Sequence, residues 1–228
     1  MGTTLQALGL PAGTPADQWL ESAPEAVSSV HERSARCGAQ VVRTATLCTR
    51  PDRDPRAFGR RHRVAVAAAR ESGAEQVWWS LGPAGPGRGP LDALDLLHDL
   101  AVDAILLETF VDADEALDTL AALRRRSGGH PVLVSMVPRS DGRLFDGRPL
   151  PHDALLEAGA AGVGANCGRA PADVLRMVEP LPDGPWLAAP CGGHGLPEVL
   201  RALAPRCRWL GGCCGVSPER LEAAWPSS

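Results

Sequence analysis

Lysine and tyrosine are absent from this 228-residue sequence. Every fixed positive side-chain charge is therefore an arginine, and the arginines are scattered among acidic residues, with a net charge of −4. Nucleic-acid-binding proteins usually carry a basic stripe or patch, which this distribution does not provide. No apolar run approaches the ~20 residues needed to span a bilayer, and the first residues lack the basic and apolar regions of a signal peptide. We therefore expect a cytoplasmic protein that binds neither nucleic acid nor membrane.

The seven cysteines are an odd number for a set of disulfides. Disulfide frameworks belong to secreted proteins, and the sequence shows no secretion signal. Cysteines in such a chain more often bind metal or act as catalytic thiols. Cysteines that lie together in the fold are therefore candidates for such a site.

Short apolar segments alternate with helical segments along the whole chain. Such short, wholly apolar strands are typical of a buried parallel sheet, and repeated strand–helix units predict one. The expected strands are 40–44, 77–81, 104–107, 132–136, 162–166, 186–189 and 209–211. The expected helices are 24–37, 56–72, 91–100, 112–125, 152–158, 171–178, 196–203 and 218–225.

These elements predict a compact (β/α)8-type TIM barrel spanning residues 1–228 as one domain. An eighth strand would have to lie before residue 5, so we expect the first strand to be truncated or missing. Barrels of this type typically have ~250 residues, slightly more than this chain. A doubly wound open sheet is the structural alternative, but no GxGxxG motif opens a helix to support it.

Three cysteines follow predicted strands. Cys167 ends one strand in Gly-Ala-Asn-Cys-Gly, and Cys213 and Cys214 follow another in Gly-Gly-Cys-Cys-Gly. Because the carboxyl ends of parallel strands form one face, these thiols can converge. Inert buried cysteines would explain the spacing equally well, but the unusual GGCCG string favours a site.

Three thiolates with an open fourth position are the ligands of a catalytic zinc site. A substrate thiol in the fourth position loses its proton to become a nucleophile at neutral pH. The three cysteines therefore suggest chemistry on a small thiol.

The motifs resemble those of the homocysteine S-methyltransferase family. GANCG at 164–168 is similar to the family's GxNC motif, and GGCCG followed by Val-Ser-Pro-Glu is similar to its GGCCGTTPEH segment. The resemblance continues in the same order across nearly the whole chain, at residues 1–3, 42–46, 81–85, 106–110 and 141–143. The most similar type is the homocysteine-binding domain of cobalamin-dependent methionine synthase.

This resemblance implies a zinc-dependent enzyme that transfers a methyl group to the thiol of homocysteine, forming methionine. It implies Zn²⁺ bound by Cys167, Cys213 and Cys214, with no catalytic residue beyond the metal-activated thiol. Glu108 would hold the amino group of the substrate. The resemblance places four further residues at the substrate site, namely Gly2, Thr3, Thr44 and Ser135.

The sequence leaves other functions open. The methyl donor cannot be read from the motifs, and the family's Asp-Gly before Met-Gly-Thr is missing here. A non-catalytic zinc-binding degenerate barrel acting in a complex is one alternative, and a methyltransferase for another small thiol or selenol is a second. Because a missing strand leaves two open sheet edges, we expect a partner, either a second copy in a homodimer or a separate methyl-donor or cobalamin protein.

Overall fold

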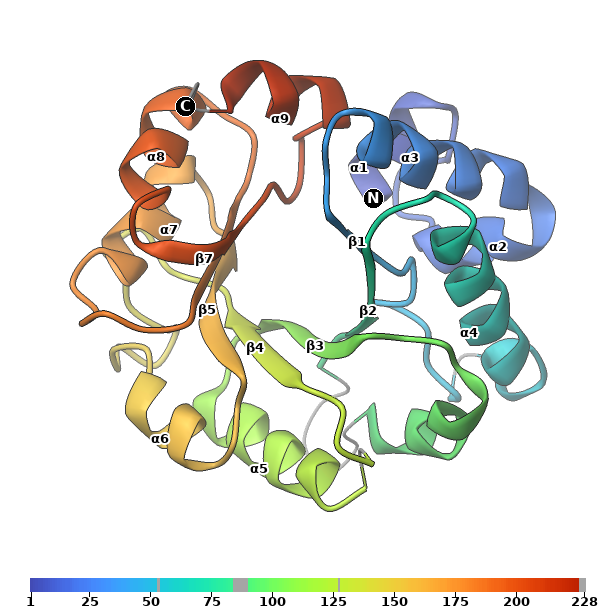
Figure 1. The fold of residues 1–228 in the computed structure, drawn as a ribbon, viewed down its shortest axis with the longest axis horizontal. Coiled ribbons are helices and arrows are strands. Elements are labelled where there is room, and N and C mark those ends of the chain that lie inside the picture. Colours follow the sequence, from blue (N-terminus) through green and yellow to red (C-terminus); the bar gives the residue numbers. More distant parts are fainter. Residues whose placement is uncertain (53, 84–89, 127, 226–228) are drawn as a thin grey trace.

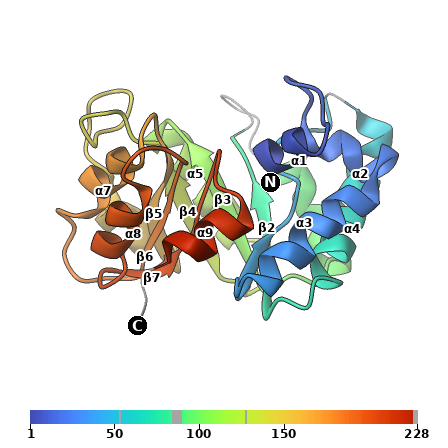
Figure 2. The ribbon, with the colours of Figure 1, turned by 90° about the horizontal axis from the view of Figure 1, so that it is seen from above.

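A computed structural model describes residues 1–52, 54–83, 90–126 and 128–225. Seven parallel strands form one sheet in the order β1 to β7, so each strand pairs with the next along the chain. The strands are β1 (Val41–Arg43), β2 (Gln76–Leu81), β3 (Ala104–Phe110), β4 (Val132–Met136), β5 (Gly162–Cys167), β6 (Trp186–Pro190) and β7 (Cys207–Leu210). The parallel sheet expected from the sequence is confirmed, and the sheet curls like a barrel with helices on its outside (Figure 1 and Figure 2).

The helices alternate with these strands along most of the chain. They are α1 (Gly2–Ala7), η1 (Ala16–Gln18), α2 (Trp19–Ser22), α3 (Pro24–Arg36), α4 (Pro55–Arg70), η2 (Pro90–Asp99), α5 (Ala113–Arg124), α6 (His152–Glu157), α7 (Pro171–Val178), α8 (Leu196–Leu203) and α9 (Pro218–Ala224). Proline in the first turn begins several of them, where its missing N–H costs no hydrogen bond. Ser217 caps α9 by accepting a hydrogen bond from the Arg220 N–H.

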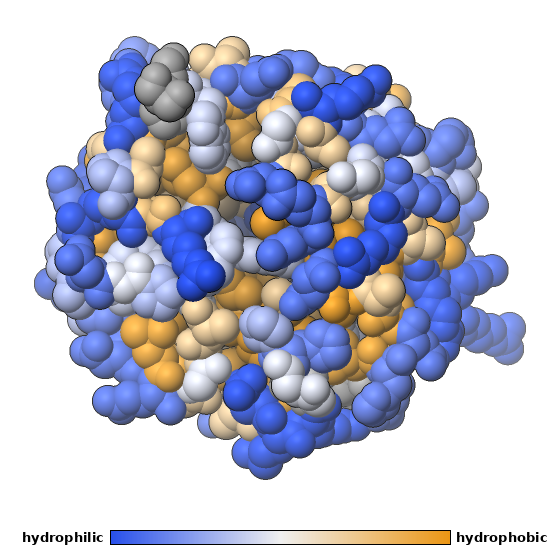
Figure 3. Space-filling view, viewed as in Figure 1, coloured by the Kyte–Doolittle hydropathy of each residue, from blue (hydrophilic) through white to orange (hydrophobic). Residues whose placement is uncertain are grey.

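Each strand sends alternate side chains to opposite faces of the sheet. Trp79 lies in the large core between the sheet and the outer helices. Trp78 lies in a smaller cluster on the other face with Leu106 and Leu133, and its ring meets Trp209 edge to face at 5.7 Å. The curled sheet is therefore packed on both faces, as a barrel is. On the surface, polar residues form the periphery, and apolar residues gather toward the middle of the face in Figure 3.

The expected truncation of the first strand agrees with the structure. In the described part of the chain no strand precedes β1, and the sheet order ends at β1 and β7 without pairing them. The segment before β1 is helical, and α1, η1 and α2 were missing from the sequence-based assignment. Residues 91–100 were expected to form an ordinary helix, but the structure has a 3-10 helix there.

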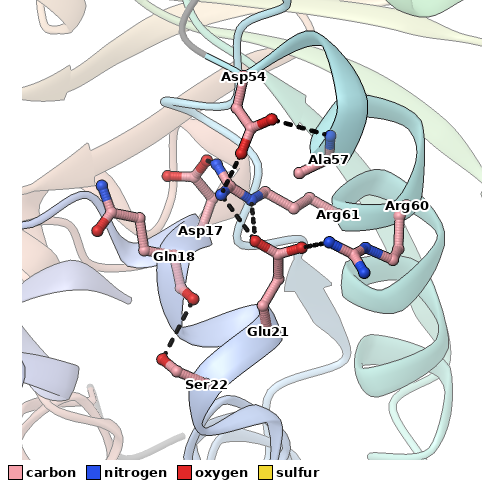
Figure 4. A network of polar contacts seen from close by, with 8 residues as sticks. All are labelled: Asp17, Gln18, Glu21, Ser22, Asp54, Ala57, Arg60 and Arg61. Carbon is pink, nitrogen blue, oxygen red and sulfur yellow. Dashed lines mark hydrogen bonds and ion pairs between the residues drawn. The ribbon is translucent and has the colours of Figure 1, made fainter.

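The added N-terminal helices are fixed to α4 by a group of charges (Figure 4). The Arg61 guanidinium donates hydrogen bonds to Glu21 at 2.7 Å, Asp54 at 3.1 Å and Asp17 at 3.3 Å. Arg60 also pairs with Glu21. Because Arg61 is mostly buried with three acidic partners, the group stabilises one arrangement of these helices against the barrel.

His62 of α4 makes stability depend on pH. It is fully buried and accepts a hydrogen bond from Trp79 Nε1 at 2.9 Å, and burial lowers its pKa to about 4. In the unfolded chain the pKa of this histidine is about 6.5. Between pH 6.5 and pH 4 the unfolded chain therefore binds a proton that the folded protein does not, and the free energy of unfolding falls as the pH drops through this range. We expect this residue alone to cost about 2 kcal/mol between pH 7 and pH 5.

Urea unfolding of the metal-free protein at both pH values measures this loss. His62→Gln keeps an acceptor for Trp79 and has no titrating ring, so it should lose about 2 kcal/mol less than the wild type over the same interval. His31, whose pKa burial also lowers to about 4, continues to contribute in both proteins. Parallel pH curves for the two proteins would contradict the assignment.

Candidate active site

The three predicted cysteines lie together at the carboxyl ends of β5 and β7. The Sγ atoms of Cys167, Cys213 and Cys214 are all within 4.8 Å of one another, and those of Cys213 and Cys214 are 4.0 Å apart. In a tetrahedral zinc site with Zn–S distances of ~2.3 Å, the sulfurs lie about 3.8 Å from each other. The spacing of the three sulfurs therefore fits a metal ion of this size.

Backbone hydrogen bonds hold the two cysteine segments beside the end of β6. The Cys213 N–H donates to the Pro190 carbonyl at 2.9 Å, and the Gly192 N–H donates to the Cys214 carbonyl at 2.6 Å. A Cβ at Gly192 would lie only 2.4 Å from the Gly215 oxygen, so only glycine permits this approach. Gly192, in the loop after β6, thus allows this loop to lie directly against the cysteine pair.

Asn166 organises the neighbouring backbone. Its side-chain oxygen accepts hydrogen bonds from Ser135 Oγ at 2.7 Å and from the Thr109 N–H at 3.2 Å, and its amide donates to Thr109 Oγ1 at 2.9 Å. Thr109 has φ 69° and Cys167 has φ 68°, in the left-handed region that β-branched residues avoid. Such conformations cluster at functional sites, where the surroundings fix them. Asn166, part of the GANCG motif, is a residue that the sequence reasoning did not single out.

The thiols differ in their affinity for protons. The pKa of Cys213 is lowered by hydrogen bonds from the Cys167 and Cys214 thiols and by the positive charge of Arg43. The pKa of Cys167 is raised, because it donates to its two neighbours and because it is partly buried. The Asn166 amide also donates weakly to the Cys213 sulfur, at 3.7 Å. Cys213 is therefore the thiol of the cluster whose deprotonation its neighbours favour most.

Glu108 of β3 lies in the same region, nearly buried. Its Oε2 accepts a hydrogen bond from Ser80 Oγ at 2.6 Å, and its Oε1 pairs with Arg43. Arg43 also donates to the Gly212 carbonyl at 2.7 Å, directly before the cysteine pair. The amino group of Met1 is buried among these groups too, and burial and then Arg43 lower its pKa. Charges of both signs therefore border the thiol cluster.

The other predicted substrate residues lie nearby, and the side chains of Thr3, Thr44 and Ser135 make hydrogen bonds within the protein. Thr3, on α1 beside Gly2, accepts a hydrogen bond from the Gly215 N–H at 2.9 Å. Thr44 accepts one from the Ser80 N–H at 3.0 Å and shares another with Thr46. Ser135 bonds Asn166, as described above. Thr3 thus touches the cysteine loop directly, whereas Thr44 and Ser135 support Ser80 and Asn166. Part of the predicted 81–85 resemblance lies outside the described residues.

The structure thus has a TIM-barrel-like fold with three thiols gathered at the carboxyl edge of its sheet, where they could hold a metal ion. The homocysteine S-methyltransferase family model matches residues 1–224. The chain belongs to this family.

Curated relatives match over part of their length. The betaine–homocysteine S-methyltransferase 1 of Rattus norvegicus is 26% identical over 167 residues, covering 57% of this chain and 40% of the relative. The S-methylmethionine–homocysteine S-methyltransferase of Pongo abelii is 27% identical, covering 54% of this chain and 43% of the relative. The chain thus matches less than half the length of these two relatives.

The solved structures agree over almost the whole fold. The homocysteine methyltransferase MmuM of Escherichia coli in its apo form has a TM-score of 0.79 and 25% identity, covering 98% of this chain and 92% of MmuM. Its metallated form has a TM-score of 0.82 at 24% identity, with the same coverage. A helix long and apolar enough to cross a membrane does not occur among the described residues.

Proposed function

We propose that this protein is a zinc-dependent S-methyltransferase that methylates the thiol of homocysteine to form methionine. The observation that carries the proposal is the convergence of three cysteine sulfurs within 4.8 Å in a member of this family. Zinc bound there would hold the acceptor as a thiolate, which is the nucleophile the reaction needs. All seven cysteines are free, which suits a reducing compartment such as the cytoplasm.

The residues around the cluster would orient the acceptor. Backbone contacts from β6 fix the direction of Cys213 and Cys214, and Asn166 fixes the strained end of β3. Glu108 presents a carboxylate that suits the ammonium group of an amino acid. Alignment of the thiol with a methyl donor is the main contribution that such a rigid site can make to the rate.

The direct test is methionine formation from homocysteine by zinc-loaded protein, with methyl donors supplied one at a time. Betaine and S-methylmethionine come first, because relatives are named for them, followed by S-adenosylmethionine and a methylcobalamin protein. Zinc binding without turnover on any donor would support the non-catalytic alternative. Turnover only with another thiol or a selenol would change the acceptor and leave the site intact.

We also propose that a second copy of the chain covers the open side of the sheet. In the described residues β1 pairs with β2 alone and β7 with β6 alone, so each presents an outer edge, and exposed edges favour association. We expect light scattering at micromolar concentration to give twice the mass of 23.9 kDa. A stable monomer would contradict this, and a mass that doubles only with a methyl-donor protein would identify a hetero-complex.

A further inference from the structure

Arg43 occupies a position at the site that the thiol chemistry does not explain. It ends β1, and its side chain crosses above β2 to Glu108 on β3 while also reaching the loop after β7. Its side chain remains 28% exposed, whereas that of Glu108 is 7% exposed. A guanidinium held between the cysteine loop and a carboxylate, yet open to solvent, is available to a ligand.

The hydrogen-bonding capacity of the pair is not exhausted. A guanidinium has five N–H donors, and a carboxylate has about four acceptor positions. Contacts with described residues use two of the donors, to Glu108 and Gly212, and two of the acceptor positions, from Arg43 and Ser80. Arg43 can therefore bind a carboxylate and Glu108 an ammonium while the ion pair between Arg43 and Glu108 stays intact.

An amino-acid thiol matches this arrangement. Homocysteine carries its carboxylate and its ammonium on one carbon, two methylenes from the sulfur. Arg43 contacts the carbonyl of Gly212, the residue before Cys213, so the charged pair lies beside the sulfur cluster. The positive charge of Arg43 also explains how Glu108 can be nearly buried, because a buried carboxylate without a charged partner is costly.

We infer that Arg43 binds the carboxylate of the acceptor and, with Glu108, selects thiols that end in a zwitterion. This rests on the proposed function and adds to it the residue that recognises the carboxylate. A planar fork can bind a carboxylate through two parallel hydrogen bonds, which a lysine cannot reproduce. Arg43 is thus a specificity-determining residue, whereas the cysteines hold the reacting sulfur.

Three thiols of matched length separate the two charges. Homocysteine has both groups, 4-mercaptobutyrate has only the carboxylate, and 3-mercaptopropylamine has only the ammonium. In calorimetry on zinc-loaded protein, Arg43→Met should weaken binding of the first two by about 10–100-fold, as expected for a charged hydrogen-bonded contact. Binding of 3-mercaptopropylamine should stay unchanged or tighten, because Glu108 loses its competing partner.

Zinc content and circular dichroism of the variant are measured first. If Arg43→Met does not fold or does not retain zinc, two other measurements decide. On the wild type, 4-mercaptobutyrate should bind at least about 10-fold more tightly than the uncharged 1-butanethiol. Arg43→Lys should weaken the two carboxylate-bearing thiols and leave 3-mercaptopropylamine unaffected, because it keeps the charge and loses the fork.

Equal weakening of all three thiols would mean that Arg43 only holds the Gly212 loop, and the inference would be overturned. Unchanged homocysteine binding in the variant, or no preference of the wild type for 4-mercaptobutyrate over 1-butanethiol, would overturn it as well and leave the proposed function standing. A zinc-loaded wild type that binds none of the thiols would overturn both.

Discussion

Alanine at Cys213 or at Cys214 is expected to leave the purified protein with far less than one zinc per chain. Structural four-ligand zinc sites bind with about 10–16 kcal/mol, so one ligand accounts for roughly 3 kcal/mol or more, on the order of 100-fold in affinity. Here only three ligands come from the protein, and losing one leaves two. Methyl transfer should disappear with the metal, because in the proposed reaction the metal converts the acceptor thiol to a thiolate.

The measurement is metal analysis of protein purified without chelator, where the wild type should carry about one zinc per chain. Cys37→Ala is the matched control, since Cys37 follows α3 and lies outside the cluster. It should retain the wild-type zinc content and activity. Full zinc retention by both Cys213→Ala and Cys214→Ala would remove these residues from the metal site.

The shared location of the cysteines could be predicted because it follows from the topology. Parallel strands joined by helices place their carboxyl ends on one face, so Cys167 after β5 and Cys213 after β7 were expected at the same end of the sheet. The close approach of the sulfurs within 4.8 Å also depends on the loop after β7, whose shape the strand pattern does not give. The strands agree with expectation to within a few residues, and β4 agrees fully, because wholly apolar runs between turn signals leave few other assignments.

The charged pair beside the cysteines could not be predicted in the same way. Arg43 and Glu108 lie on strands that are not neighbours, with β2 between them. Their contact depends on the register of both pairings, in which Arg43 lies opposite Trp78 and Trp78 opposite Ala104. Register follows from side-chain packing across the sheet and not from the pattern of one strand.

The N-terminal helices were missed for a different reason. α1 has six residues and α2 has four, too short to show a helical period or to be stable alone. They are held by tertiary contacts, which include the burial of Leu5 and Leu20 against α3 and the Arg61 charge group. The family resemblance predicts a strand near this position, whereas the structure has helices there.

Glu108→Gln is expected to weaken homocysteine binding by about 10–100-fold while zinc content stays at the wild-type level. Glutamine keeps the size of the side chain and an oxygen for Arg43, and it loses the negative charge that we propose binds the substrate ammonium. A hydrogen bond to a charged group contributes roughly 1.5–3 kcal/mol, which corresponds to this factor. Arg43 is also left without its counter-charge, so the free energy of unfolding should fall by about 1–3 kcal/mol.

Calorimetry on zinc-loaded protein separates the ammonium contact from general damage to the site. 3-Mercaptopropylamine should lose affinity in Glu108→Gln as homocysteine does, whereas 4-mercaptobutyrate, which has no ammonium, should bind as well as before. Glu157→Gln on the exposed end of α6 is the matched control and should change neither affinity. If homocysteine binds Glu108→Gln as tightly as the wild type, Glu108 does not contact the substrate, and its carboxylate serves only to balance Arg43 at the edge of the sheet.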